Sequence, residues 1–126
     1  MTPGAALERA RAAIGAPFRL HGRDPASGLD CVGLAAFAWD VAPPTGYALR
    51  CGSMAQVERW LATLGFTPRR DAGPGAVAIV AAGAGQLHLG ILAERGIIHA
   101  DATARRVVER GEPLPWPVLG RWIGEN

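Results

Sequence analysis

The stretch GLDCVGLAAFAW, residues 28–39, decides the fold that we expect for this chain. An apolar run without a polar face predicts a helix buried on nearly every side. Asp30 is a favourable N-cap residue, so the helix should begin at Cys31. A thiol therefore stands at the tip of the most buried element, where packing alone would accept alanine.

This central helix should run to about Val41, because the following pair Pro43-Pro44 forbids its continuation. An earlier helix is predicted from Thr2 as N-cap to Gly15 as the terminating residue. Its buried stripe should consist of Leu7, Ala10, Ala13 and Ile14. Residues 16–30 carry several prolines and glycines, which predicts a loop.

A third helix is indicated by Ser53 and Gln56, which form a capping-box signature, and it should close at Gly65. Beyond this helix the hydrophobic period becomes that of strands. The expected strands are residues 76–81, 88–94, 96–102, 104–110 and 119–124. The chain is therefore predicted to be a single α+β domain over residues 1–126, with N-terminal helices packed on a small antiparallel β-sheet.

Composition excludes several classes of protein. The chain has 126 residues, 49% of them hydrophobic, and a net charge of +2, which is typical of a globular domain. Its basic residues are all arginines and are scattered, so they form no stripe for nucleic acid. No window reaches the roughly 18 apolar residues of a membrane span. We expect neither a nucleic-acid partner nor a membrane.

The two cysteines, Cys31 and Cys51, fit no zinc-binding spacing, so no metal or other cofactor is expected. We interpret Cys51 as an ordinary free thiol. A disulfide between the two is the alternative, and it would silence Cys31 as a nucleophile.

Cys31 has the surroundings of a reactive thiol. A helix N-terminus offers unpaired N–H groups and a partial positive charge, which favour the thiolate. The same N–H groups can stabilise an oxyanion when sulfur attacks a carbonyl. A nucleophile also needs a base, and the chain offers three histidines: His21, His88 and His99.

His88 begins one expected strand and His99 ends the next. In a hairpin with an even-numbered loop an odd residue faces an even one, so both side chains should project from one face. A two-residue turn at Ala93-Glu94 would place them directly opposite each other. Gly96 favours a later turn, which would stagger them, and a three-residue bulged loop would break the parity.

Two blocks of sequence resemble the NlpC family of cell-wall cysteine peptidases, which have a compact papain-like fold. The first is GAPFRLHGRDPASGLDCVGL, and the second comprises PGAVAIV and HLGILAERGIIHA. Together they cover roughly residues 15–100 in the family's order. The resemblance implies Cys31 as nucleophile, His88 as general base and then acid, and His99 as the third member of the triad. It also implies that Asp30 caps the helix and contacts the substrate amine.

The implied substrate is the peptide stem of bacterial peptidoglycan, cut next to D-glutamate and a diamino acid. The sequence departs from the family at Phe18, where a tyrosine hydroxyl often contributes to substrate or oxyanion binding. His21, Arg19 or Arg23 would have to replace it, or the oxyanion hole is made of backbone alone. Val32 and Ala76 replace a usual serine and aspartate.

The start of the sequence, MTPGAALERARAAIG, lacks the apolar core of a signal peptide. The chain most resembles small single-domain versions carried by phage tails and gene-transfer agents. We therefore expect synthesis in the cytoplasm, incorporation into a virion-like tail with tail or baseplate proteins, and action on the periplasmic cell wall. The alternatives are a structural tail-tip protein with weakened activity, and another thiol chemistry such as an amidase or acyltransferase.

Overall fold

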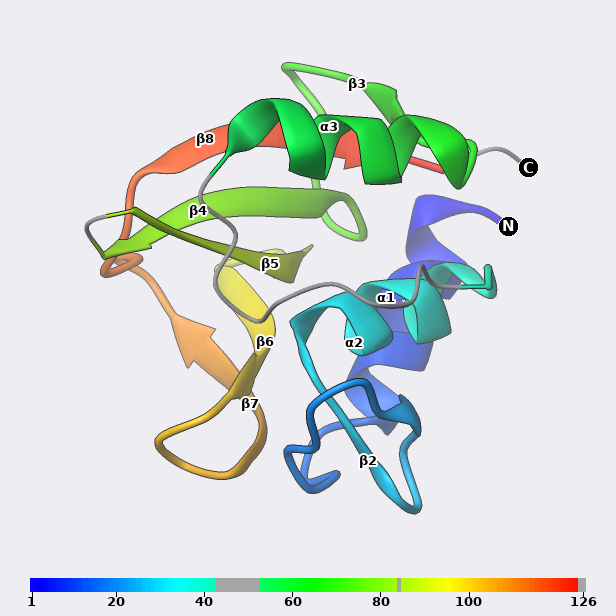
Figure 1. The fold of residues 1–126 in the computed structure, drawn as a ribbon, viewed down its shortest axis with the longest axis vertical. Coiled ribbons are helices and arrows are strands. Elements are labelled where there is room, and N and C mark those ends of the chain that lie inside the picture. The colour runs from blue at the N-terminus through cyan, green and yellow to red at the C-terminus, as the bar shows by residue number, and fades with distance from the viewer. Residues whose placement is uncertain (43–52, 84, 125–126) are drawn as a thin grey trace.

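A computed structural model describes residues 1–42, 53–83 and 85–124 (Figure 1). Pro43, Pro44 and Cys51, on which expectations were stated above, lie outside the described residues. The elements are α1 (Pro3–Ala12), β1 (Arg23–Asp24), β2 (Gly28–Leu29), α2 (Cys31–Trp39), α3 (Met54–Thr63), β3 (Thr67–Pro68), β4 (Val77–Gly83), β5 (Gln86–Ala93), β6 (Gly96–Asp101), β7 (Arg106–Gly111) and β8 (Val118–Ile123). The predicted α+β organisation is confirmed.

The three helices of the described residues begin directly after the predicted N-cap residues. The hydroxyl of Thr2 accepts a hydrogen bond from the Ala5 N–H at 3.1 Å, and that of Ser53 accepts one from Gln56 at 3.3 Å. The Asp30 carboxylate caps α2 in the same way. Each cap satisfies an N–H group that the first helical turn leaves unpaired, so the signal is local and readable from sequence.

The first helix is shorter than predicted. It ends at Ala12, with Ala13 as its C-cap, and Gly15 follows with a φ of 92°. Leu7, Ala10 and Ala13 are buried as expected, whereas the Ile14 side chain is 42% exposed. The prediction for Ile14 was wrong because this residue lies beyond the last helical turn, where the helical spacing no longer directs it to the core.

A six-stranded antiparallel sheet forms the C-terminal part, in the order β3-β8-β4-β5-β6-β7. On one face Leu89, Ile91 and Ile98 join the core that contains Leu34 of α2 and Leu7 of α1. The opposite face carries a smaller apolar cluster, to which Val80, Leu92, Ile97 and Trp116 belong. Helix α2 packs against α1 and against strands β5 and β6, as Figure 1 shows.

Two short pairings were not predicted. The segment expected to be a loop contains the β1–β2 hairpin, in which Arg23 pairs with Leu29 and Asp24 with Gly28. Strand β3 pairs with β8 at the sheet edge. Strands of two residues have no hydrophobic period, so the sequence gives no signal for them. Among the described residues, none of the helices has both the length and the apolar character needed to cross a bilayer.

Candidate active site

Cys31 is the first residue of α2, as predicted, and its side chain is 4% exposed. Its thiol is free. The loop before the helix packs closely on the first helical turn: a Cβ atom added at Gly33 would lie 2.0 Å from the Gly22 carbonyl oxygen. Glycine at position 33 therefore allows this loop to approach the N–H groups that surround Cys31.

Asp30 anchors the same loop to the helix. One carboxylate oxygen accepts the Gly33 N–H and the other accepts the His21 N–H, each at 2.8 Å. The side chain is fully buried. Since both oxygens hold backbone N–H groups, the geometry gives Asp30 a positioning role, and its contact with a substrate amine stays a prediction.

His88 of β5 and His99 of β6 meet on one face of the sheet. The Nε2 atom of His88 lies 3.0 Å from the Nδ1 atom of His99, and the two rings stand edge to face. The hairpin turn consists of Glu94 and Arg95, because Ala93 pairs with Gly96. The shared face is thus confirmed, and the later turn staggers the two residues along their strands.

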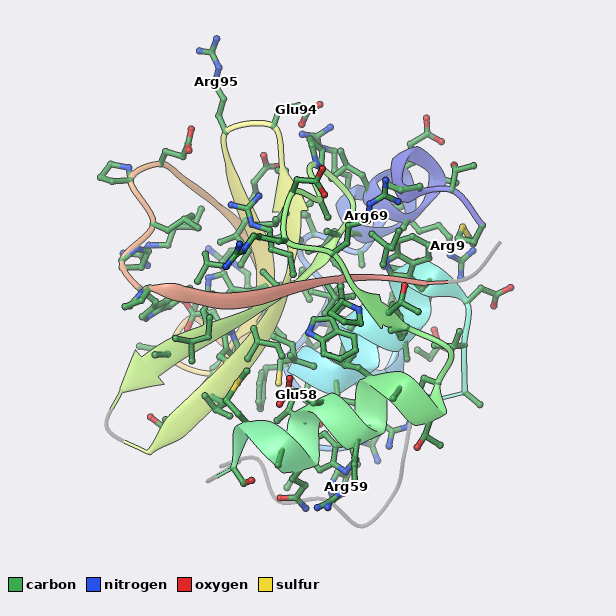
Figure 2. The ribbon with its side chains drawn as sticks, turned by 90° about the horizontal axis from the view of Figure 1, so that it is seen from above. Arg9, Glu58, Arg59, Arg69, Glu94 and Arg95 are labelled. Atoms are coloured by element: carbon green, nitrogen blue, oxygen red, sulfur yellow. The ribbon has the colours of Figure 1, made fainter. Side chains whose placement is uncertain are left out.

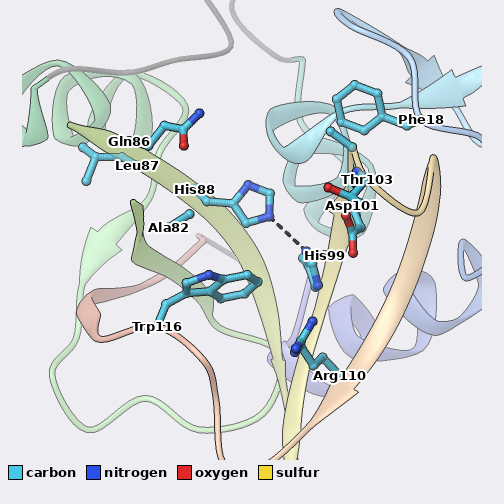
Figure 3. A pocket seen from close by; sticks show the side chains of 12 residues that line it. Phe18, Ala82, Gln86, Leu87, His88, His99, Asp101, Thr103, Arg110 and Trp116 are labelled. Atoms are coloured by element: carbon cyan, nitrogen blue, oxygen red, sulfur yellow. Dashed lines mark hydrogen bonds between the residues drawn. The ribbon is translucent and has the colours of Figure 1, made fainter. Parts of the chain in front are cut away.

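The histidine pair lies where β5 and β6 are no longer paired. The β5–β6 ladder extends from the pair Ala93 and Gly96 only as far as Ile91 and Ile98. Beyond it, His88 remains paired with Val80 of β4, and His99 with Val108 of β7. The two strands therefore diverge, and the imidazole pair spans the gap between them (Figure 3).

Both imidazoles are neutral at neutral pH. Burial, followed by the nearby His99, lowers the pKa of His88 to about 4. Burial also lowers the pKa of His99, although Asp101 opposes this. Burial opposes ionisation of Asp101 too, yet the N–H groups of Ala104 and Thr103 and the two histidines hold its pKa below the ordinary value. A neutral His88 can accept a proton, which is the property of a general base.

A cavity of about 480 Å³ opens beside the histidine pair. Figure 3 shows His88, His99 and Phe18 among its lining residues, with Trp116 next to the pair. The Trp116 ring stands edge to face against both imidazoles, at centroid distances of 5.6 and 5.0 Å. Sequence reasoning missed Trp116, and the only signal was a tryptophan between two prolines at 115–117.

The remaining predicted residues lie outside this cavity lining. Cys31 and Asp30 are buried at the start of α2, and His21 is exposed with a φ of 59° in the preceding loop. Arg23 lies in β1, where its guanidinium donates to the Gly22 carbonyl oxygen. Helix α2, which begins at Cys31, packs against β5 and β6, the strands that carry the histidines.

Within residues 1–42, 53–83 and 85–124, no three side chains of His, Cys, Asp or Glu are grouped so that they could hold an ion. The chemistry that the arrangement supports is that of a thiol and a neutral imidazole, oriented by a second imidazole.

No protein-family model matches the chain, and no curated protein sequence matches it. Its structure, in contrast, is similar to solved structures. NlpC1 from Trichomonas vaginalis has a TM-score of 0.69 at 18% identity, with 96% of this chain and 44% of that chain covered. The NlpC/p60 domain of the peptidoglycan hydrolase SagA has a TM-score of 0.57 at 24% identity, with 88% and 90% covered.

This chain has the NlpC/P60 fold. A third similar structure, from Staphylococcus aureus, is described as similar to a lipoprotein of the NLP/P60 family, with a TM-score of 0.64 at 17% identity. The chain spans 46% and 44% of the lengths of NlpC2 and NlpC1 from Trichomonas vaginalis. The NlpC/P60 fold confirms the predicted packing of N-terminal helices on an antiparallel sheet. The catalytic roles of Cys31, His88 and His99 stay predictions.

Proposed function

We propose that the protein is a cysteine peptidase that hydrolyses peptide-stem bonds of bacterial peptidoglycan. The observation that carries the proposal is the hydrogen-bonded pair of His88 and His99, on the two strands against which α2 packs with Cys31 at its start. The likeness to the NlpC/p60 domain of a peptidoglycan hydrolase supports the substrate class.

In the proposed reaction, Nδ1 of His88, the ring nitrogen that does not face His99, takes the proton of the Cys31 thiol. The sulfur attacks the peptide carbonyl carbon, and N–H groups at the start of α2 stabilise the oxyanion. His88 then gives its proton to the leaving amine, which leaves an acyl-thioester on Cys31. Water, deprotonated by His88, hydrolyses the thioester and restores the thiol.

Digestion of purified peptidoglycan tests the proposal. We expect the wild-type protein to release stem peptides and Cys31→Ala to release none above background. Cys51→Ala is the matched control, because it removes the other cysteine and should retain activity. Release by Cys31→Ala at the wild-type rate would contradict the proposed nucleophile. Mass spectrometry of the products separates peptidase cleavage from amidase or acyltransferase chemistry.

A structural tail-tip protein with weakened activity is the second candidate. Two observations favour it: the Cys31 side chain is only 4% exposed, and Phe18, which lines the cavity, has no hydroxyl to donate. Particles that assemble normally with Cys31→Ala, together with intact peptidoglycan after wild-type treatment, would favour this candidate.

Delivery on a phage-like or gene-transfer-agent tail is part of the proposal and rests on the resemblance of the sequence to small tail-borne domains. Quantitative mass spectrometry of purified particles tests it. The protein should be enriched with tail and baseplate proteins. Its recovery in the periplasm of cells that lack particle genes would argue against this route.

A further inference from the structure

The outer edge of strand β8, on the side of the two-residue strand β3, is only partly covered. Strand β3 pairs with β8 at Ile123 and Trp122. One more hydrogen bond joins the Arg69 N–H to the Arg121 carbonyl oxygen at 2.7 Å. Among the described strands, none pairs with residues 118–120 on that side. A length of strand edge is therefore open to another chain.

The register of β8 shifts at this open edge. The ladder with β4 passes from Gly120 to Val118, so Leu119 has no partner residue in the ladders of the described strands, and its side chain is 46% exposed. A cavity of about 390 Å³ lies beside it. Arg121 and Trp122, whose side chains leave opposite faces of β8, both border this cavity. The cavity therefore follows the edge of the sheet rather than one face.

Three arginines border this cavity, namely Arg69, Arg70 and Arg121. Arg69 and Arg121 lie opposite each other in neighbouring strands, so their like charges leave the same face and destabilise the pairing. Arg121 donates one N–H to the Ala72 carbonyl oxygen at 2.7 Å. Asp71 lies 3.6 Å from Arg69 in a largely exposed ion pair, which offsets the repulsion only weakly.

The edge keeps a net positive charge. No ion pair within the described part of the chain includes Arg70 or Glu58, the acidic residue of α3 that also borders the cavity. A second copy of the same edge would bring like charges together, whereas an acidic chain would relieve the repulsion between Arg69 and Arg121. Charge thus selects the kind of strand that can pair here.

We propose that the outer edge of β8 binds an extended, acidic segment of another polypeptide. The main chain of that segment pairs with residues 118–120 as an added strand, and its carboxylates contact the three arginines. Main-chain pairing distinguishes this partner from other polyanions. The inference is independent of the proposed function, because no residue that borders this cavity takes part in the proposed reaction.

Two matched peptides test the inference. Both have blocked ends and are about six residues long, the usual length of a strand. Threonine alternates with glutamate in one and with lysine in the other, so all charged side chains leave one face of the extended peptide. Calorimetric titration into the full-length protein should give a dissociation constant of about 100 μM or tighter for the glutamate peptide, and one at least about tenfold weaker for the lysine peptide.

A methylated form of the glutamate peptide tests the main-chain pairing. Methyl groups on all its amide nitrogens remove every donor and keep every carboxylate, so its affinity should fall at least about tenfold. Hydrogen exchange followed by mass spectrometry then locates the site. The unmethylated glutamate peptide should slow exchange in the segment that contains residues 118–120.

Three substitutions test the role of charge. Arg70→Glu should weaken binding of the glutamate peptide at least about fivefold and strengthen binding of the lysine peptide, and Arg70→Ala should only weaken the former. Arg95→Glu is the matched control, since it reverses an arginine at the exposed tip of the β5–β6 hairpin (Figure 2). Circular dichroism should show that all three variants remain folded, and all three should act on peptidoglycan as the wild-type protein does.

Several outcomes would overturn the inference. They are equal affinity for the two peptides, unchanged binding to Arg70→Glu, undiminished binding of the methylated peptide, and no binding up to about 1 mM. A single-stranded oligonucleotide that binds as tightly as the glutamate peptide would also overturn it, because main-chain pairing would then contribute nothing. Digestion of peptidoglycan without peptide binding would refute only the docking edge, and peptide binding without digestion would refute only the proposed function.

Discussion

His88 and His99 share a hydrogen bond of 3.0 Å across the gap where β5 and β6 cease to pair. If His88 carries its proton on Nε2, it donates to Nδ1 of His99 and leaves its own Nδ1 as the proton acceptor. His99 must then carry its proton on Nε2, which is buried and has no hydrogen-bond partner among the described residues. The Trp116 ring stands edge to face against the His99 ring, with the ring centroids 5.0 Å apart.

Replacement of His99 tests its role as the residue that orients His88. His99→Ala should lower kcat by about 100-fold, the lower end of what acid–base groups contribute. The Coulombic effect of His99 on His88 disappears, so the acid limb of the pH–rate profile should move to higher pH. His99→Gln keeps an acceptor oxygen and should recover part of kcat. A lower kcat with an unmoved profile would indicate a purely structural role.

The pH dependence of wild-type activity follows from the pKa of His88. The neutral form acts as the base, so activity should fall as the pH drops through the pKa of about 4 rather than through the ordinary 6.5. The measurement is the initial rate of stem-peptide hydrolysis between pH 3 and 8. Samples pre-incubated at each pH and returned to pH 7 show whether a loss of rate is due to titration or to unfolding. A midpoint of the activity profile near pH 6.5 would contradict the lowering of the His88 pKa by burial.

The folding stability should depend on pH in the same range. The unfolded chain binds a proton at His88 near pH 6.5, whereas the native state binds it only near pH 4. The neutral His88 imidazole therefore makes its full contribution to the free energy of unfolding above pH 6.5. This contribution is lost as the pH falls toward 4, by up to about 3 kcal/mol. Urea denaturation at pH 7 and pH 5 measures the change, and His88→Gln should reduce it.

Gly33→Ala tests the close packing of the loop on α2. The new Cβ atom would lie 2.0 Å from the Gly22 carbonyl oxygen, so the loop or the helix must move. We expect a loss of about 2–3 kcal/mol in the free energy of unfolding. Gly73→Ala is the control, because nothing lies within 4 Å of a Cβ atom there. Equal stability of the two variants would show that the loop adjusts freely.

Phe18→Tyr tests the departure of this chain from the family pattern. Phe18 lines the cavity beside the histidines, so a hydroxyl added there lies within the site. A new hydrogen bond to the substrate or oxyanion should raise kcat/KM by about fivefold, the gain of one neutral hydrogen bond. Phe66→Tyr, in the buried core, is the control and should give no gain. An unchanged rate in Phe18→Tyr would favour an oxyanion hole made of backbone alone.

The sequence by itself determined the features that depend on residues close together along the chain. Thr2, Asp30 and Ser53 were identifiable as caps because each binds an N–H group three residues further along. The burial of α2 followed from its uniformly apolar composition. Strand alternation predicted a shared face for His88 and His99 if the turn was even-numbered, and the structure supplied that turn.

Only the tertiary structure decided how those elements meet. The stagger of the histidines depends on the turn at Glu94 and Arg95. The point at which β5 and β6 stop pairing goes with the separate pairing of β5 with β4 and of β6 with β7. Trp116 joins the site through contacts distant in sequence. Such contacts depend on strand register and sheet twist, which local sequence patterns do not encode.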